Sequence, residues 1–259
     1  MTGRVARGAG AAPLAAIALW LALPCGSAAA QSLTLSPAVV PLGGRPGQST
    51  TQELRLYNGT GQALDFALVA RDVVVRDGAR AQLDAGSVRG SIAATAVFSA
   101  AAVHVAPGEE RRVRVTLTLP PQLAGRAVMI VFQGTTRVAG SATLSLGSLL
   151  TFDLAGRQSV AIGELVAAPP TASANARIAL AVVNDGSEPV IARGAAAIVS
   201  SGGALVGRLA LGAHRLLPGE RGALEADYAG ALPSGRYRVI ATVEAVRGAW
   251  TRSAELAVP

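Results

Sequence analysis

Lysine is absent from this 259-residue chain, and all 23 of its basic residues are arginine. Because arginine stays protonated at physiological pH, the chain has no amine side chain that could form a Schiff base or act as a general base. Cysteine occurs once, at Cys25. These absences exclude lysine-dependent catalysis and any disulfide within the chain, so each folded domain must be held by its apolar core.

Aromatic residues make up only 3% of the chain, which has a formal net charge of +7. Proteins that bind single-stranded nucleic acid interleave aromatic side chains with basic ones, so that bases can stack beside a neutralised backbone. Here the arginines are scattered singly and no such alternation occurs. The composition therefore argues against a nucleic-acid partner.

No apolar run after the first thirty residues is long and uniform enough to cross a membrane as a helix. The first thirty have the pattern of a secretory signal peptide. Arg4 and Arg7 precede an apolar stretch at residues 14–23, and three alanines at 28–30 form a small-residue cleavage site. We expect cleavage after residue 30, export to the periplasm or the outside of the cell, and a mature net charge of +5.

Cys25 leaves a second interpretation of this leader open. It follows the apolar stretch within the sequence Leu-Pro-Cys-Gly, where a lipoprotein signal would place its acceptor cysteine. Pro24 stands where such signals favour a small flexible residue, which makes lipidation at Cys25 the less favoured alternative. Cleavage after residue 30 would leave the mature chain without a thiol.

One series of turns occurs twice. An Asn-Gly-type turn follows an apolar strand, a Pro-Gly-Glu turn opens a later strand, and a Gly-Arg pair follows a proline. The two copies are separated by 110 to 126 residues, which is the size of a small domain. The two series are Asn58-Gly59, Pro107-Gly108-Glu109 and Gly125-Arg126, then Asn184-Asp185-Gly186, Pro218-Gly219-Glu220 and Gly235-Arg236.

The segments between these turns alternate apolar and polar residues with a period of two, as half-buried strands do. The clearest example is residues 112–119. Together the segments predict an all-β chain with two tandem immunoglobulin-like sandwiches, at residues 31–156 and 157–259. Further expectations are a strand covered on both faces at 127–132 and a last strand of the first domain at 143–154. Residues 79–102 are expected to be a loop with one irregular strand around 96–99, and residues 133–142 a second loop.

Residues with the potential for chemistry are few. His104 and His214 each precede a Pro-Gly-Glu turn without further ligands at metal-binding spacing. No Gly-x-Ser-x-Gly elbow occurs, and nothing singles out a pair of carboxylates. Asn58-Gly59-Thr60 matches the glycosylation triplet, but we interpret it as an Asn-Gly turn that needs a positive φ. We therefore predict a non-enzymatic protein without a cofactor or metal.

The order of strands and turns in the first domain resembles that of periplasmic pilus-assembly chaperones. The matching features are a strand ending in Asn58, a Pro-Gly-Glu turn at Glu109, the run at residues 128–132 and the alternating last strand. The resemblance covers most of residues 32–156 and, more loosely, the second domain. It implies two immunoglobulin-like domains and binding of a pilus subunit by edge-strand contacts.

In that family, alternating apolar residues of the last strand complete the subunit's sandwich. Leu144 and Leu146 are the matching positions, and Arg137 lies in the loop before them. Alternatively, the two leucines are ordinary inward-facing residues of a self-contained sheet. The family also holds its subunit's terminal carboxylate with an arginine on the first strand and a lysine on the last. Here residues 36–38 include no arginine and the chain has no lysine.

Two hypotheses for the partner follow. The first is a protein subunit of a surface structure, bound by Leu144, Leu146 and Arg137. The second is cell-wall polymer bound through loops, with Arg45, Arg137 and Arg157 as candidate contacts. A Pro-Gly-Gln loop at residues 46–48 resembles one in surface proteins that bind peptidoglycan. Since the repeated turns serve both domains, we expect specific function where the copies differ, in the loop at 133–142 and the strand after it.

Overall fold

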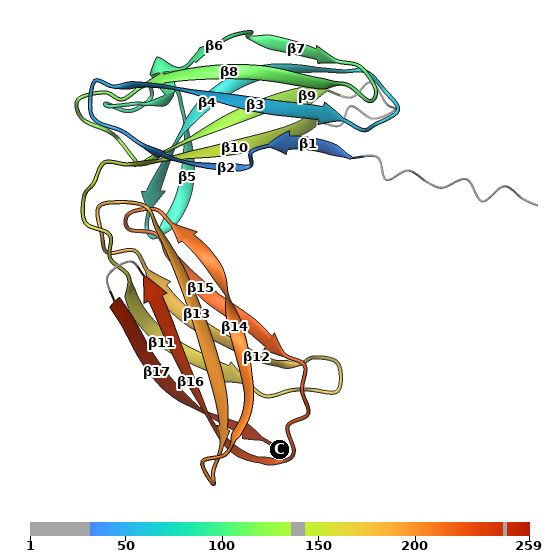
Figure 1. Cartoon of the computed structure of the whole chain (residues 1–259), viewed down its shortest axis with the longest axis vertical. Helices are drawn as coiled ribbons and strands as arrows, with labels where there is room; N and C mark the ends of the chain where they lie inside the picture. The colour runs from blue at the N-terminus through green and yellow to red at the C-terminus, as the bar shows by residue number, and fades with distance from the viewer. Residues whose placement is uncertain (1–31, 136–142, 246–247) are drawn as a thin grey trace, which may run out of the picture. The chain divides into compact units, whose positions relative to one another are not determined.

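The computed structural model describes residues 32–135, 143–245 and 248–259, and Ser32–Pro259 forms one compact unit. Almost all of its regular structure is β-strand, with one short 3₁₀ turn, η1 (Ala93–Thr95), as the exception in the described residues (Figure 1). The all-β prediction is confirmed. The predicted signal peptide lies outside the described residues.

The first sandwich packs two sheets face to face. One sheet has the strand order β1-β3-β8-β6, and the other has the order β2-β10-β9-β4-β5, with β7 also paired to β4. The strands are β1 (Leu33–Ser36), β2 (Val39–Gly43), β3 (Ser49–Asn58), β4 (Leu64–Arg76), β5 (Ala79–Asp84), β6 (Val97–Phe98), β7 (Ala102–Val105), β8 (Glu110–Thr118), β9 (Ala127–Thr135) and β10 (Thr143–Asp153).

The second sandwich follows with seven strands, the number predicted. Its sheets have the orders β11-β12-β15 and β14-β13-β16-β17, and all pairs are antiparallel. The strands are β11 (Ala161–Ala168), β12 (Ala176–Val183), β13 (Val190–Ser200), β14 (Leu205–Leu216), β15 (Arg221–Tyr228), β16 (Gly235–Ala245) and β17 (Gly248–Val258).

Alternation along each strand produces these layers. In β8, Val113, Val115 and Leu117 are buried while Arg112 and Arg114 are exposed, as their period of two requires. The run at residues 127–132 is nearly continuously buried, as expected for a strand covered on both faces. Each sandwich encloses its own core of mainly aliphatic side chains, and burial of each valine or leucine contributes about 1.5–3 kcal/mol.

The repeated turns form the same hydrogen-bonded lock in both sandwiches. In the Asn58 lock, the buried Asn58 amide donates to the carbonyl oxygens of Gln62 (2.7 Å) and Val105 (2.9 Å). The Gly108 amide donates to the Asn58 carbonyl at 2.7 Å, and Glu109 Oε2 accepts from the Ala106 amide at 2.8 Å. These bonds tie the end of β3 to the turn that opens β8.

The Asn184 lock repeats this arrangement at the corresponding positions. Its amide donates to the carbonyls of Glu188 (2.8 Å) and Leu216 (3.0 Å). Gly219 donates to the Asn184 carbonyl at 2.8 Å, and Glu220 Oε2 accepts from the Leu217 amide at 2.7 Å. Equivalent atoms make equivalent bonds in both copies, which supports the predicted duplication.

The glycosylation triplet is a turn, as predicted, although the reason we gave for it is wrong. Gly59 does not have a positive φ. Instead, a Cβ at Gly59 would lie 2.6 Å from the Ser32 carbonyl oxygen, so the close approach of the chain requires glycine there. The Asn58 side chain is buried and both of its amide donor contacts are internal.

The segment at 79–102 contains the irregular strand predicted around 96–99, which is β6, but it also contains β5 and the start of β7, which were not predicted. β5 forms a hairpin with β4, and β7 begins at Ala102 and pairs with β4 further along. β9 also continues to Thr135, so the loop predicted from residue 133 begins later, and its residues 136–142 lie outside the described part of the chain.

Candidate partner-binding edge

β10 has a paired strand on both sides at residues 149–151 only (Figure 1). It runs antiparallel to β9 from Thr143 to Thr151, whereas β2 joins its other side, in parallel, only from Leu149 onward. Among the described residues, no strand pairs with that other side at residues 143–148. We call residues 144–147 the free edge.

Hydrogen bonds at the paired end identify which backbone groups face the free edge. The Leu149 amide donates to the Ala38 carbonyl (2.9 Å), and the Asp153 carbonyl accepts from Gly44 (3.1 Å), so odd-numbered residues face β2. Because successive peptide groups of a strand point to opposite sides, Ser145 and Gly147 direct their N–H and C=O groups to the free edge. Both residues are exposed. Their backbone is available to an added strand.

The free edge exists because the first strand changes sheets. β1 pairs with β3 in one sheet, and after Pro37 the chain enters β2 and pairs with β10 in the other. Ser148 marks the crossing, since its buried hydroxyl donates to the Pro37 carbonyl at 2.7 Å. N-terminal to Ser148, β2 does not run beside β10.

Leu144 and Leu146 point inward from the free edge. Both are half-buried and pack against the first core, as do Leu33 and Leu35 of β1. Further along β10, the inward-facing Leu150 and Phe152 are completely buried. The orientation of the two leucines matches the alternative of inward-facing residues, but the core is incompletely covered where β2 is missing. Arg137 lies outside the described residues.

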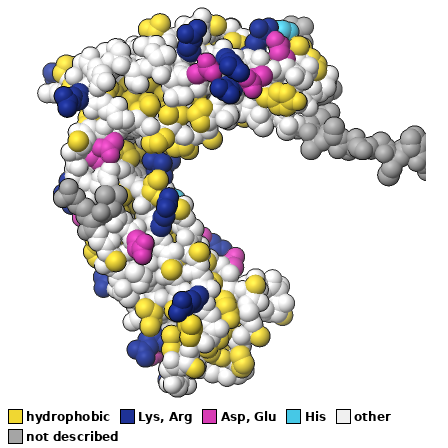
Figure 2. Space-filling view, viewed as in Figure 1, with side chains coloured by type: hydrophobic (Ala, Val, Ile, Leu, Met, Phe, Trp, Pro, Cys, Tyr) yellow, Lys and Arg dark blue, Asp and Glu magenta, His cyan; other side chains and the backbone are white. Residues whose placement is uncertain are grey.

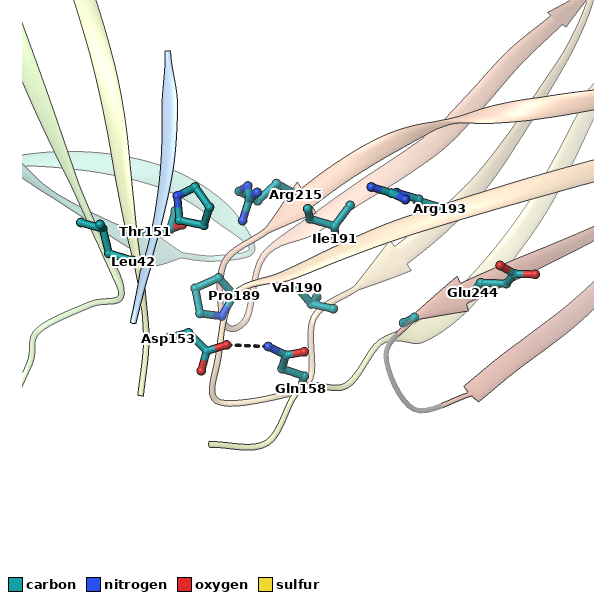
Figure 3. Close-up of a pocket in the computed structure, with 12 residues that line it drawn as sticks. Leu42, Thr151, Asp153, Gln158, Pro189, Val190, Ile191, Arg193, Arg215 and Glu244 are labelled. Atoms are coloured by element: carbon teal, nitrogen blue, oxygen red, sulfur yellow. Dashed lines mark hydrogen bonds between the residues drawn. The ribbon is translucent and has the colours of Figure 1, made fainter. Parts of the chain in front are cut away.

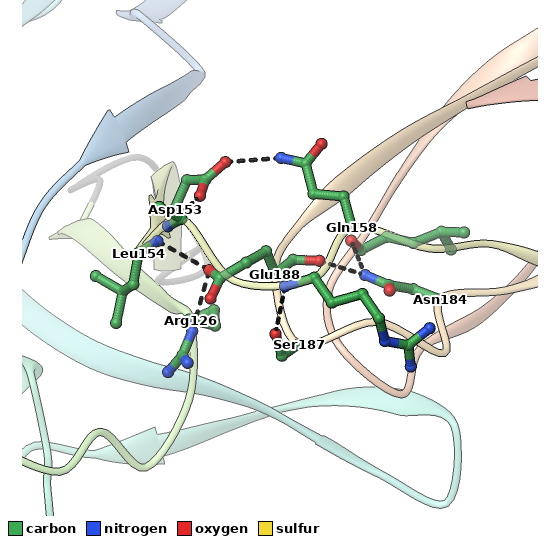
Figure 4. Close-up of polar contacts among 10 residues, drawn as sticks. Arg126, Asp153, Leu154, Gln158, Asn184, Ser187 and Glu188 are labelled. Atoms are coloured by element: carbon green, nitrogen blue, oxygen red, sulfur yellow. Dashed lines mark hydrogen bonds and ion pairs between the residues drawn. The ribbon is translucent and has the colours of Figure 1, made fainter. Parts of the chain in front are cut away.

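The other end of β10 is fixed by Glu188, which is 1% exposed (Figure 4). Its Oε2 accepts from the amide of Leu154 at 2.9 Å and pairs with Arg126 Nε at 3.3 Å. Its own carbonyl accepts from the Asn184 amide, so the carboxylate is held by the Asn184 lock. The residue directly after β10 is thereby tied to the second sandwich.

The β4–β5 hairpin makes a second set of bonds to the Asn184 lock. Arg80 Nε pairs with Glu220 Oε1 at 2.8 Å, and the Arg221 amide donates to the Gly78 carbonyl at 2.8 Å. Leu217 of the same turn is 1% exposed and packs in a small cluster with Leu149 of β10 and neighbouring side chains of the first sandwich. An apolar cluster, an ion pair and a backbone hydrogen bond therefore join the two sandwiches beside the residues of β10 that pair with β2.

Of the arginines proposed as polymer contacts, Arg45 and Arg157 lie within the described residues and Arg137 does not. Arg157 pairs with Asp185 (3.8 Å) and also donates to its carbonyl, while Arg45 lies exposed in the turn closed by Gln48. Figure 2 shows arginines on the visible face mixed with acidic side chains rather than gathered in one basic patch.

Neither histidine is part of a metal site in the described residues. His104 Nδ1 lies 2.8 Å from Asp65 Oδ1 in an exposed pair on neighbouring strands. No group of three or more histidine, cysteine or acidic side chains suited to a metal ion occurs in the part of the chain that the structure describes. None of the described helices is long and apolar enough to span a membrane.

No protein-family model and no curated protein matches this sequence. Solved structures do match, and they include several fimbrial chaperones. The class 5 fimbriae chaperone CfaA is 13% identical over 88% of this chain and 100% of its own, with a TM-score of 0.45. The E. coli chaperone DraB is 16% identical over 87% and 98%, with a TM-score of 0.41. The Salmonella enterica chaperone SafB, solved in complex with the SafA pilin, is 11% identical over 88% and 97%, with a TM-score of 0.41.

Proposed function

We propose that this chain is an exported, non-enzymatic protein that binds an extended segment of a protein subunit, as a pilus chaperone does. The segment adds as a strand to the free edge of β10. The observation that carries this proposal is the unpaired side of residues 144–147 beside a β2 strand that begins to pair only at Leu149. Export to the periplasm or the cell surface follows from the predicted signal peptide.

Strand addition uses main-chain hydrogen bonds for affinity and alternating side chains for specificity. Ser145 and Gly147 supply donors and acceptors at the free edge, while Leu144 and Leu146 supply apolar surface that is only half-buried. An apolar side chain of the bound segment would extend the first core beside these leucines. The preferred segment is therefore one that alternates apolar and polar residues.

β10 is held in place by its neighbours, which lowers the conformational entropy lost when a partner binds. Its neighbour β9 is paired with β4 along most of its length, and its C-terminal end is tied to Glu188. A partner that adds to a fixed strand loses only its own conformational freedom, since the template is already ordered. No observation favours cell-wall polymer as the ligand.

Photocrosslinking tests this proposal directly. A photoreactive amino acid at Ser145, in the exported full chain expressed in its host, should give a discrete adduct with an exported subunit. Mass spectrometry should place the crosslink within an alternating apolar segment of that subunit. The matched control carries the same group at Ser253, an exposed position on β17. Equal adducts at both positions, or none at Ser145, would contradict strand addition at β10.

The leucines provide a second measurement. Leu144→Asp combined with Leu146→Asp should abolish the Ser145 adduct, because charged side chains would then border the apolar core. Leu205→Asp is the control, since Leu205 is already 53% exposed on β14. Circular dichroism must show that the double variant keeps its β structure. An adduct of undiminished yield in the folded double variant would refute a binding role for these leucines.

A further inference from the structure

Met129 is the only residue with sulfur in the part of the chain that the structure describes. The sequence has one further methionine, Met1, and one cysteine, Cys25, and both precede residue 31. Met129 lies on β9 between Val128 and Ile130, which point into the first core, so its own side chain points to the outer face of the sheet. A thioether takes up oxygen from peroxides, which turns an apolar side chain into a polar one.

The sulfur of Met129 lies over the backbone of Gly147 in the free edge. A Cβ on Gly147 would be 2.7 Å from the sulfur, so the thioether can occupy this position because Gly147 has no side chain. Gly147 is exposed, and Met129 is itself only partly buried. The sulfur therefore lies at the outer surface of the sheet, where small solutes have access.

The same side chain packs against the apolar cluster that joins the two sandwiches. The buried members of this cluster are Leu149, which is directly opposite Met129 in the ladder, Val73 and Ala127 of the first sandwich, and Leu217 of the second. Leu149 is 5% exposed and Leu217 is 1% exposed. Of the apolar clusters in the described residues, this one alone has members from both sandwiches.

Further along β10, at Thr151, the two sandwiches are separated by a cavity of about 530 Å³ (Figure 3). Its walls come from both sandwiches and include Pro41 and Leu42 on one side and Val190, Arg193 and Arg215 on the other. Since side chains do not fill this space, the apolar contact between the sandwiches depends on the small cluster beside Met129. A polar group introduced into that cluster should weaken the contact.

We propose that Met129 is a redox-sensitive site at which a peroxide weakens the contact between the two sandwiches. A lone pair of the sulfur attacks one peroxide oxygen, the O–O bond breaks, and the other oxygen leaves as water after proton transfer. The sulfur is thereby oxidised to a sulfoxide and hydrogen peroxide is reduced. The sulfoxide oxygen is a hydrogen-bond acceptor without a donor among the apolar side chains of the cluster, so it is better solvated when the side chain turns away from Leu149 and Leu217.

Treatment of the mature chain with hydrogen peroxide, followed by thermal unfolding, tests this on the free protein, whether or not a subunit adds to β10. Mass spectrometry should find one added oxygen atom, at Met129, taken up within about tenfold of the rate of N-acetyl-methionine in the same solution. The melting temperature should fall by about 3 °C or more, because a polar group then borders a buried apolar cluster.

Met129→Leu is the matched control, since leucine keeps the apolar contact and nearly the same volume but has no sulfur. The melting temperature of this variant should be the same with and without peroxide. Slower or absent oxygen uptake at Met129, a smaller fall in the melting temperature of the oxidised protein, or an equal fall in the leucine variant would overturn the proposal.

Discussion

Amide hydrogen exchange in the free protein should alternate along the first half of β10. Leu144 and Leu146 lie opposite Gly134 and Phe132, and their amides face β9, so both are in the ladder. Ser145 and Gly147 face the free edge, where the described residues include no neighbouring strand. We therefore expect slow exchange of the amides of Leu144 and Leu146. The amides of Ser145 and Gly147 should exchange fast.

The size of this difference follows from the contacts that must open. Exposing the amide of Leu146 breaks about two ladder bonds worth about 1 kcal/mol each and uncovers a half-buried leucine worth about 1 kcal/mol. Opening thus costs about 3 kcal/mol, which corresponds to protection of about 100-fold at Leu144 and Leu146. Ser145 and Gly147 need no opening and should exchange within about tenfold of an unstructured peptide.

Heteronuclear NMR with residue-specific exchange rates measures this pattern, and Leu149 provides an internal control. Its amide also belongs to the odd-numbered series but donates to Ala38 at 2.9 Å, so it should be as protected as its neighbours. Alternation should therefore stop after Gly147. Protection of Ser145 and Gly147 equal to that of Leu144 would mean that the edge is covered, and strand addition there would lose its basis.

Further expected outcomes concern the contacts between the two sandwiches, and thermal unfolding measures each of them. Glu188→Gln should destabilise the protein by about 3 kcal/mol, because it breaks a buried ion pair, whereas Glu225→Gln in an exposed pair should cost less than about 1 kcal/mol. Asn184→Ala should cost about 3 kcal/mol, since it leaves buried carbonyls without donors, and an unchanged melting temperature would contradict the lock. Leu217→Ala should cost about 2–5 kcal/mol by opening the cluster at the junction.

Strands with a strict period of two were predictable from the sequence, as β8 illustrates, because one face is buried and the other is exposed. β5 and β7 were missed for a physical reason. β5 lies at the margin of its sheet and has two alanines and mostly exposed side chains, so no strong apolar alternation marks it. β7 has only four residues, which is too short for its alternation to stand out. Their position is set by pairing with β4, which is a tertiary contact.

The candidate site was predictable only in part. The alternation of Leu144 and Leu146 identified a strand, and the resemblance to chaperones pointed to its edge. Nothing in the local sequence states which side of a strand lacks a neighbour, because that depends on where β2 begins to pair.

The two locks also show how a duplicated feature acquires a separate role. Ala106 and Glu109 in the first copy correspond to Leu217 and Glu220 in the second. Glu109 is bonded within its own sandwich, to Arg111 at 2.9 Å, whereas Glu220 bonds to Arg80 across the junction and is far more buried. Replacement of alanine by leucine at the neighbouring position adds the apolar contact that covers Leu149. We had interpreted recurrence in both copies as evidence of a scaffold without specific function. That interpretation applies to Asn58 and Asn184, which make the same bonds in each sandwich. The Asn184 lock has a further role, because it fixes the C-terminal end of β10, whereas the free edge lies at the N-terminal end of the same strand.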